Sequence, residues 1–504
     1  MNQSLLRRII PLVLVAGLFF SGLWGVCPLS HAGAPQNVIL MIGDGLGLES
    51  VWAAGAYQFG SDYHKFGGKE KLNFEKLAGF CWMTTYPLNL STFPTNEASS
   101  PVSYDPTWTR GGKPGQLDYP RFGPELSFNG MAKGELGEGP GQGGGRIYAT
   151  DSGSSATSMA CGIKTYLNAI GMDNFNRPCK NIMEKFQEKG KKTGVVTSVQ
   201  FSHATPAGFT AHNVSRKNYW AIAEEMIRVI QPEVIMGAGH PAFDEYGSPR
   251  TPEYRYLAAE DFRFLSQGPA GGGGPYSLVE TREQFLELKK GSPPARVFGL
   301  IQNQKGIKPS LADGSQADPR LPTLKEMSQG ALAVLSPEGK GFFLMIEGGA
   351  IDRGHHHNDL NLAIGEMIGF QEAVQAVMAW IEDPRNPQSG WDKNLLIVTA
   401  DHETGYLSGI GNKGRGVIPD HVYNSKEHTN RPVGVWYQGA GMEFFQKYLK
   451  TVNDFERGEI QLIDNTDLHK VMEESLQAPP KSKPVPEPEK KDLSFWWEDS
   501  KKAA

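Results

Sequence analysis

Residues 340–359 read K-G-F-F-L-M-I-E-G-G-A-I-D-R-G-H-H-H-N-D. Within them, residues 342–346 form a short and wholly apolar run, which is typical of a strand that is buried on both faces of a sheet. Glu347 follows the run directly, and Gly348 and Gly349 then indicate a tight turn. The stretch therefore predicts a central strand whose carboxyl end carries an acidic side chain.

The same stretch offers a second set of metal ligands. Asp352 and His356 are four residues apart, so a helical turn would place both on one face, where they can hold one ion. Oxygen ligands such as Glu347 suit Mg²⁺, whereas a mixed Asp/His set suits Zn²⁺. The plainer alternative is a polar surface turn, but buried strands seldom end in so many ligands.

Three other apolar runs end in the same way. Residues 37–42 lead to Asp44, residues 193–200 lead to Thr205, and residues 394–399 lead to Asp401 and His402. Helical patterns are predicted between these runs, over residues 181–189, 219–230 and 360–381, and after a capping box at Thr323 and Glu326. Strands that alternate with helices predict an α/β fold with a mostly parallel sheet, in which ligands gather at the carboxyl ends of the strands.

Residues 148–165 read Y-A-T-D-S-G-S-S-A-T-S-M-A-C-G-I-K-T and predict a helix with Thr150 and Asp151 at its cap. Ser152 then falls in the first turn, where free N–H groups favour an anion, although a serine there is often only a cap. Thr205 precedes a proline and is expected to be extended. Arg216 lies just before the helix of residues 219–230, where an arginine is usually solvated.

Composition narrows the class of protein. The 504 residues are 39% hydrophobic and 21% charged, which is ordinary for a soluble globular chain. A formal net charge of −5 argues against nucleic-acid binding. Arg7 and Arg8 precede an apolar run at residues 9–26, and Ser30-His31-Ala32 resembles a cleavage site, so residues 1–32 are predicted to be an export signal. The alternative is an uncleaved membrane anchor.

The remaining segments set the expected domain organisation. A catalytic domain is predicted over residues 33–477, with insertions rich in glycine and proline at about 91–146 and 240–320. The second insertion carries one helical patch near residues 283–289. Residues 478–504 alternate Pro, Lys and Glu and are predicted to be a disordered tail. Without the signal, three cysteines remain, so at most one disulfide can form within the chain.

Taken together, the motifs resemble those of the alkaline phosphatases over residues 36–445. The motifs are G-D-G at 43–45, T-D-S-G-S-S-A-T at 150–157, H-A-T-P-A at 203–207, E-G-G-A-I-D-R-G-H-H at 347–356, T-A-D-H at 399–402 and H-T at 428–429. The resemblance implies a three-layer sandwich with helices on both sides of the sheet. It also implies an exported hydrolase of phosphate monoesters, in the periplasm or outside the cell, and a homodimer.

The resemblance also implies residue roles. Ser152 would be the nucleophile that forms a phosphoserine, and Arg216 would hold the phosphate oxygens. Two Zn²⁺ ions and one Mg²⁺ are implied, with these ligands: Asp352, His356 and His428 for the first zinc; Asp401, His402 and Asp44 for the second; Asp44, Thr205 and Glu347 for magnesium.

Several positions depart from the common pattern of that family. His203 lies beside the expected magnesium ligands, where some members have an acid, and Thr404 stands where many have a histidine. Arg353 is at a variable position next to Asp352. His355 and His357 flank a predicted ligand and are interpreted as non-ligands.

Other activities on the same architecture remain open. A sulfatase would need a proline and an arginine after its nucleophile, and residues 153–155 are Gly-Ser-Ser. A phosphodiesterase would usually lack the magnesium carboxylate, whereas Glu347 is present. A protein that binds phosphate without catalysis is the third alternative.

Overall fold

The computed structural model describes residues 33–96, 149–272, 274–307, 311–337, 339–454 and 458–477. The predicted signal at 1–32, residues 97–148, which include most of the first insertion, and the tail at 478–504 lie outside the described residues. Within the described part, no helix is both long and apolar enough to cross a bilayer.

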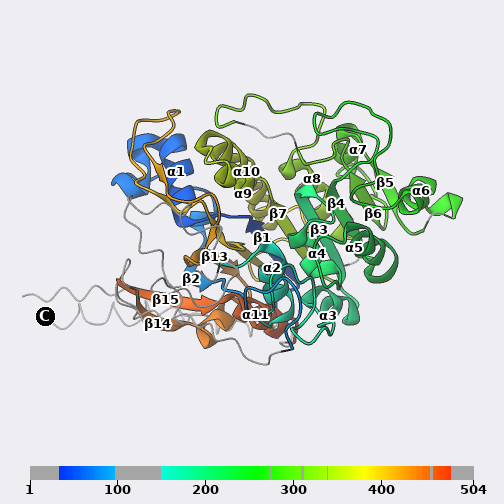
Figure 1. The fold of residues 1–504 in the computed structure, drawn as a ribbon, viewed down its shortest axis with the longest axis horizontal. Helices are drawn as coiled ribbons and strands as arrows, with labels where there is room; N and C mark the ends of the chain where they lie inside the picture. Colours follow the sequence, from blue (N-terminus) through cyan, green and yellow to red (C-terminus); the bar gives the residue numbers. More distant parts are fainter. Residues whose placement is uncertain are drawn as a thin grey trace, which may run out of the picture.

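An eleven-stranded sheet runs through the middle of the molecule (Figure 1), in the order β14-β15-β2-β13-β8-β1-β7-β3-β4-β6-β5. The strand bounds are β1 Asn37–Gly43, β2 Gly79–Thr84, β3 Lys192–Gln200, β4 Val234–Ala238, β5 Ser277–Val279, β6 Val297–Leu300, β7 Phe342–Gly348, β8 Asn394–Ala400, β13 Val433–Gly439, β14 Lys450–Asp454 and β15 Gly458–Asp464. Only β13 with its two neighbours, and β14 with β15, pair antiparallel. The predicted mostly parallel sheet is therefore confirmed.

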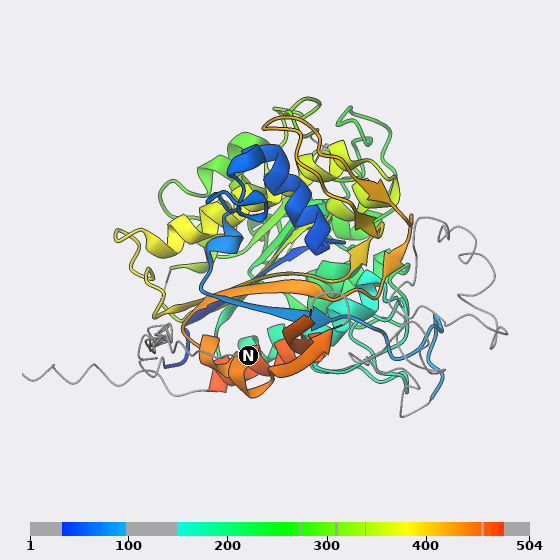
Figure 2. The ribbon, with the colours of Figure 1, turned by 90° about the vertical axis from the view of Figure 1, so that its left-hand side faces the viewer.

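Helices cover both faces of this sheet, as the edge-on view of Figure 2 shows. One layer contains α1 (Leu48–Phe59), α7 (Arg282–Glu287), α8 (Leu324–Leu335), α9 (Ile351–His356) and α10 (Leu360–Glu382). The other contains α2 (Ser152–Cys161), α3 (Ile182–Glu188), α4 (Ala204–Thr210), α5 (Tyr219–Glu225) and α11 (Asn465–Gln477). A further helix, α6 (Ala259–Gln267), packs near β5 at the sheet edge. The three layers match the predicted architecture.

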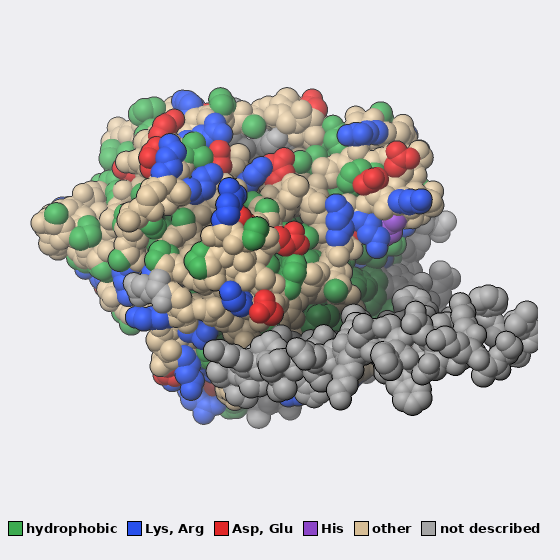
Figure 3. Space-filling view, turned by 180° about the vertical axis from the view of Figure 1, so that it is seen from behind, with side chains coloured by type: hydrophobic (Ala, Val, Ile, Leu, Met, Phe, Trp, Pro, Cys, Tyr) green, Lys and Arg blue, Asp and Glu red, His purple; other side chains and the backbone are tan. Residues whose placement is uncertain are grey.

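The central strands are buried along their whole length. Every residue of β1, β7 and β8 is buried, so both faces of these strands pack against helices. Apolar strands of this kind suit the middle of a parallel sheet, where water reaches neither face. The face of the molecule in Figure 3 carries Lys, Arg, Asp and Glu side chains interspersed over the described residues.

Two local expectations were wrong. Thr205 is not extended but lies in the first turn of α4, which begins at Ala204. Pro206 follows it in that turn, where a helix tolerates proline because the missing N–H would have no partner there. Residues 240–320 hold more than one helical patch, because they also contain α6 and the strands β5 and β6 that complete one edge of the sheet.

The described cysteines form one disulfide, which agrees with the predicted maximum of one. Cys161 and Cys179 form a disulfide, which links the last residue of α2 to the segment before α3. Cys81 is buried in β2 as a free thiol. The disulfide therefore fastens the carboxyl end of the helix whose amino end carries Ser152.

Candidate active site

Three adjacent strands bring acidic side chains to one edge of the sheet. β1 lies between β7 and β8, and Gly43 is in register with Gly348 on one side and with Ala400 on the other. The acids next to these positions, Asp44, Glu347 and Asp401, therefore lie side by side, and each is at most 1% exposed. Predicted ligands far apart in the sequence thus meet at the carboxyl ends of parallel strands.

Around these acids the described residues form three groups in which ligand atoms lie within 4.8 Å of one another. The groups are Asp352, His402 and His428; Asp44, Asp401 and His402; and Asp44, His203 and Glu347. Asp44 and His402 each belong to two groups, so the three groups are contiguous.

His356 joins the first group. Its Nε2 lies 3.2 Å from Asp352 Oδ2 and 3.1 Å from His428 Nε2, and His428 Nε2 lies 3.5 Å from Asp352 Oδ1. The other ring nitrogen of each histidine makes a hydrogen bond. His428 Nδ1 donates to the Thr150 carbonyl at 2.7 Å, and His356 Nδ1 donates to the Lys426 carbonyl. These bonds orient both Nε2 atoms toward Asp352, as second-layer contacts do at metal centres.

Two hydrogen bonds of the Thr404 hydroxyl orient His402. The Thr404 hydroxyl donates to Asp352 Oδ1 at 2.6 Å and lies 3.2 Å from His402 Nδ1, which can only donate to it. The lone pair of His402 is therefore on Nε2, which faces Asp401 Oδ2 at 3.2 Å, Asp44 Oδ1 at 3.6 Å and Ser152 Oγ at 3.3 Å. The second group thus adjoins the predicted nucleophile.

The third group contains Glu347 and the residues that surround it. The Thr197 hydroxyl donates to Glu347 Oε2. Thr205 Oγ1 and Glu347 Oε1 are buried as well, and both lack a hydrogen-bond partner among the described residues. His203 also belongs to this group, with a ring nitrogen within 4.8 Å of oxygens of Asp44 and Glu347.

The chemistry of these groups fits divalent cations. Six buried polar atoms here have no hydrogen-bond partner in the part of the chain that the structure describes: both carboxylate oxygens of Asp44, Asp401 Oδ2, Glu347 Oε1, Thr205 Oγ1 and His203 Nδ1. Each atom left in that state costs about 1–3 kcal/mol. A divalent cation is a partner that the five oxygen atoms can share, whereas His203 Nδ1 carries the ring proton, because Nε2 accepts from Arg216, and it needs an acceptor instead.

The pKa values of the buried acids also indicate that the cluster lacks positive charge. Burial, together with neighbouring carboxylates, raises the pKa of Asp44 well above its ordinary value and that of Asp401 to about 6. Burial also raises the pKa of Glu347 to about 7. Burial alone would raise the pKa of Asp352 too, but hydrogen bonds from two histidines hold it well below its ordinary value. The cluster therefore resists ionisation unless positive charge enters it.

Ser152 begins α2, and Asp151 caps that helix. The Asp151 carboxylate accepts hydrogen bonds from the N–H groups of Gly153 at 3.1 Å, Ser154 at 3.2 Å and Asn168 at 2.9 Å. Ser152 is 2% exposed at the amino end of a ten-residue helix, where the free N–H groups and the dipole favour an anion. Both features expected of the 148–165 stretch, the cap and the helix, are confirmed.

Arg216 is not a solvated side chain. Its Nη1 donates to Asp151 Oδ2 at 2.9 Å and its Nη2 donates to His203 Nε2 at 3.2 Å. Burial would raise the pKa of Asp151, but the guanidinium of Arg216 beside it lowers that pKa to about 2. The arginine is thus held near the helix that carries Ser152, and its charge acts against the rise in the pKa of Asp44 that burial causes.

The other charged residues and histidines next to Asp352 and His356 have partners of their own. His355 contacts the Ser50 hydroxyl at 2.8 Å through Nε2 and the Tyr423 hydroxyl at 2.8 Å through Nδ1, so neither nitrogen is free for an ion. Arg353 donates to the Lys305 carbonyl and to Gln200 Oε1, each at 3.0 Å. His357 Nδ1 donates to the carbonyl of Arg353 at 2.8 Å, on the helix itself.

Sequence reasoning did not single out the residues that support the ligands. Thr197 lies inside the apolar run of β3, and Glu403 lies between His402 and Thr404. Both are polar and buried, Thr197 within β3 and Glu403 three residues after the end of β8. A polar residue inside or directly after a buried strand is the signal that would have indicated them.

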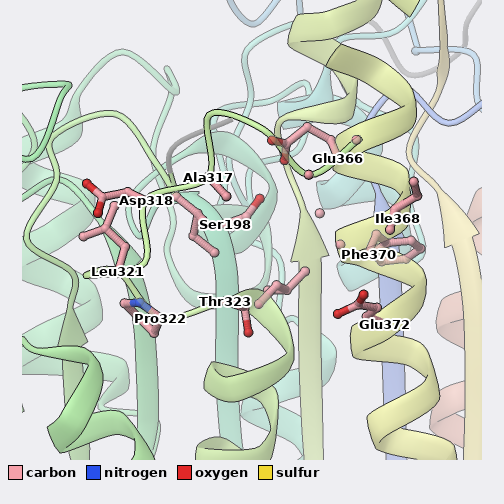
Figure 4. A pocket seen from close by; sticks show the side chains of 16 residues that line it. Ser198, Ala317, Asp318, Leu321, Pro322, Thr323, Glu366, Ile368, Phe370 and Glu372 are labelled. Atoms are coloured by element: carbon pink, nitrogen blue, oxygen red, sulfur yellow. The ribbon is translucent and has the colours of Figure 1, made fainter. Parts of the chain in front are cut away.

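A separate cavity of about 220 Å³ lies beside the site, between the ends of β3 and β7 and helix α10 (Figure 4). Ile307, Leu321, Ile368 and Phe370 are among the residues that line it, and Glu366 and Glu372 also face it. None of the ligand groups described above contributes to its wall. The cavity is therefore distinct from the metal-binding cluster.

Comparison with known proteins places this site in context. The family model described as alkaline phosphatase matches residues 145–473. Alkaline phosphatase 3 of Bacillus subtilis is 33% identical over 280 residues, which cover 55% of this chain and 52% of the relative. Alkaline phosphatase of Escherichia coli is 27% identical over 367 residues, 65% of this chain and 74% of the relative. The chain spans about half the length of the first curated relatives it matches.

Solved structures share the fold. Alkaline phosphatase from the Antarctic bacterium TAB5 superposes with a TM-score of 0.57 at 20% identity, covering 89% of this chain and 99% of its own. The cold-active enzyme of a Shewanella species gives 0.58 at 24% identity, covering 88% and 100%. An Asp-for-His variant of the TAB5 enzyme, with a TM-score of 0.56 at 19% identity and the same coverage, is described with Mg bound in its M3 site.

Proposed function

This chain belongs to the alkaline phosphatase family, and on that premise we propose that it is a metal-dependent hydrolase of phosphate monoesters that works through a phosphoserine on Ser152. The observation that carries the proposal is the placement of the Ser152 hydroxyl, 3.3 Å from His402 Nε2, at the edge of a buried cluster of unpaired ligand atoms. A serine used only as a cap would not need such surroundings.

The proposed ligand sets follow the groups in space. Two Zn²⁺ ions would be held by Asp352, His356 and His428, and by Asp401, His402 and Asp44; a Mg²⁺ would be held by Asp44, Thr205 and Glu347, with His203 close by. When bound, these ions would supply positive charge that favours an ionised serine and stabilises negative charge on the oxygens around phosphorus. Asp44 would be shared between two of the sets.

The chain's own residues would then act in order. The guanidinium of Arg216, held by Asp151, would donate to the non-bridging oxygens of the phosphoryl group. Ser152 would pass its hydroxyl proton to water, and its Oγ would form a bond to phosphorus while the bond to the ester oxygen breaks. The leaving alkoxide would take a proton back from water and depart as the alcohol. A water molecule would then attack the phosphoserine, which releases inorganic phosphate and restores the serine.

Among the described residues, the geometry does not favour a diesterase or a sulfatase, and a comparison of substrates separates the three activities. Turnover of an aryl phosphate, a diaryl phosphate and an aryl sulfate should be compared on the same zinc- and magnesium-loaded preparation. The proposal expects the monoester to be turned over fastest. A preference for the diester or the sulfate would overturn it.

The nucleophile has its own test. Ser152→Ala should lose activity while the matched variant Ser158→Ala, which changes a buried serine in the same helix, should retain most of it. Acid quenching during turnover should leave a phosphorylated peptide that contains Ser152. Full activity of Ser152→Ala, or phosphate on another residue, would refute the assignment.

We further propose that residues 1–32 direct export, so that the enzyme acts in the periplasm or outside the cell, that residues 33–477 form the catalytic unit, and that two chains associate. The proposal rests on the charged and apolar pattern of residues 1–32 and on the family. Amino-terminal sequencing of the exported protein, and its mass in solution, test these points.

A further inference from the structure

A two-stranded ribbon beside the sheet carries three of the residues described above. β9 (Glu403–Thr404) pairs antiparallel with β12 (His428–Thr429), so that Thr404 lies opposite His428 and Glu403 lies opposite Thr429. Thr404 and His428 contact the proposed ligands. Successive side chains of a strand point to opposite sides, so Glu403 and Thr429 face away from the site.

The far side of the ribbon is polar and buried. Glu403 is 2% exposed and Thr429 is fully buried, and the Thr429 hydroxyl donates to Glu403 Oε2. Glu403 also packs against the loop that follows Asp44, because a Cβ added to Gly47 would stand 2.5 Å from its Cγ. The Glu403 side chain therefore contacts both the partner strand and the Asp44 loop.

An ion pair reinforces the same junction. Arg431 Nη2 lies 2.9 Å from Glu49 Oε1, and the two side chains are only 7% and 12% exposed. Arg431 follows Thr429 by two residues, whereas Glu49 is in the first turn of α1, directly after the Asp44 loop. Arg431 also donates to the Leu407 carbonyl at 3.3 Å, and its charge acts against the rise in the pKa of Glu403 that burial causes.

We propose that Glu403, Thr429 and the Glu49–Arg431 pair form a buried clamp that fixes the ribbon, which carries His428 and directly follows His402, against the loop carrying Asp44. Glu403 is then a positioning residue, since it touches neither substrate nor ion. The clamp deepens the proposed function, on which it rests, because it sets the spacing between ligands that come from three separate segments.

The energetics favour this role over a purely structural one. Burying charged groups is a weak source of stability, and apolar residues of similar volume would often serve as well. Metal ligation, by contrast, needs its donors held to within about half an ångström. Losing an outer contact of that kind typically costs about 10–100-fold in metal affinity. A clamp should therefore affect zinc binding more than folding.

The test measures zinc affinity directly, by competition between the full chain and a chromogenic zinc chelator, beside thermal unfolding of the metal-free protein. Thr429→Val removes the hydroxyl that Glu403 accepts from, and Thr429→Ser keeps it. Glu403→Ala and Glu403→Gln form a second matched pair, in which glutamine can still accept that bond.

Thr429→Val and Glu403→Ala are expected to weaken zinc binding by about tenfold or more, and the two conservative variants by less than about threefold. If all four variants bind zinc within about threefold of the parent and differ only in thermal stability, the clamp proposal is overturned. Zinc affinity needs no turnover, so these results stand even if the parent protein hydrolyses no phosphate monoester, which would instead overturn the proposed function.

Discussion

Glu347 offers a sharp test of the idea that the buried acids are built for cations. It is completely buried, and burial raises its pKa from an ordinary 4.5 to about 7. At pH 8 and without metal, keeping this carboxylate ionised costs the folded state roughly 3 kcal/mol. Glu347→Gln removes the charge and keeps an oxygen that accepts the bond from Thr197. Its new amide group loses about 1 kcal/mol for want of a partner.

The balance predicts that Glu347→Gln stabilises the metal-free protein at pH 8 by about 2 kcal/mol, or roughly 2–4 °C in Tm. The sign depends on pH. Because the folded-state pKa of this acid is raised, its destabilising effect is absent below about pH 4.5, grows as pH rises and is complete above about pH 7. With zinc and magnesium present the effect should reverse, because the variant lacks a ligand and gains less from metal binding.

Calorimetry of chelated and metal-loaded protein from pH 4.5 to 8.5 measures both effects. Glu372→Gln is the matched control, since Glu372 is an exposed residue on α10 and the substitution should leave Tm nearly unchanged. If Glu347→Gln lowers the Tm of the metal-free protein at every pH, the carboxylate has another stabilising partner and the reasoning fails.

Three further predictions concern other charged groups. Arg216→Lys keeps the charge but loses the planar pair of donors, so kcat/KM for an aryl phosphate should fall by roughly thirtyfold, or about 2 kcal/mol; an unchanged value would exclude a phosphate contact. His203→Asp adds an oxygen ligand beside Asp44, so less Mg²⁺ should be needed for half-maximal activity in a magnesium titration; an unchanged requirement would place His203 outside the third site. Burial alone would lower the pKa of His212, but hydrogen bonds to Glu184 and Glu225 raise it to about 10. Since the folded-state pKa is raised, its stabilisation, about 5 kcal/mol, is complete below about pH 6.5 and lost as pH rises through about 10, so the Tm difference between parent and His212→Gln should shrink over that range.

The central sheet and most ligands were predictable because each follows a simple pattern. β1, β7 and β8 each contain a buried apolar run, at residues 38–42, 342–346 and 395–398, and an acid lies near the carboxyl end of each strand. Burial on both faces and exposure of the strand end to the site are local properties. A reader of the sequence can therefore find the acids without knowing the order of the strands.

Other features depend on contacts between distant residues. β5 and β6 have three and four residues, and they become strands by pairing at the sheet edge rather than through their own pattern. In the sequence, Arg216 has the pattern of a solvated side chain. In the structure it lies 2.9 Å from Asp151, which is 65 residues earlier in the chain. Thr205 is helical because the first turn of α4 accommodates the proline, which outweighs the usual preference of the residue before it.

The same reasoning explains why the site stands out. A folded protein normally pairs its buried polar atoms, yet Asp44 leaves both carboxylate oxygens without a hydrogen-bond partner among the described residues. Burial and neighbouring acids raise the pKa of Asp44, so ionising it without metal destabilises the folded state. Such a conflict between local rules and the fold is expected where function requires it. Metal binding would remove the conflict at all three groups at once, because Asp44 belongs to two of them and His402 links the third. Loading of one group should therefore ease loading of the next, and ions should bind this protein cooperatively.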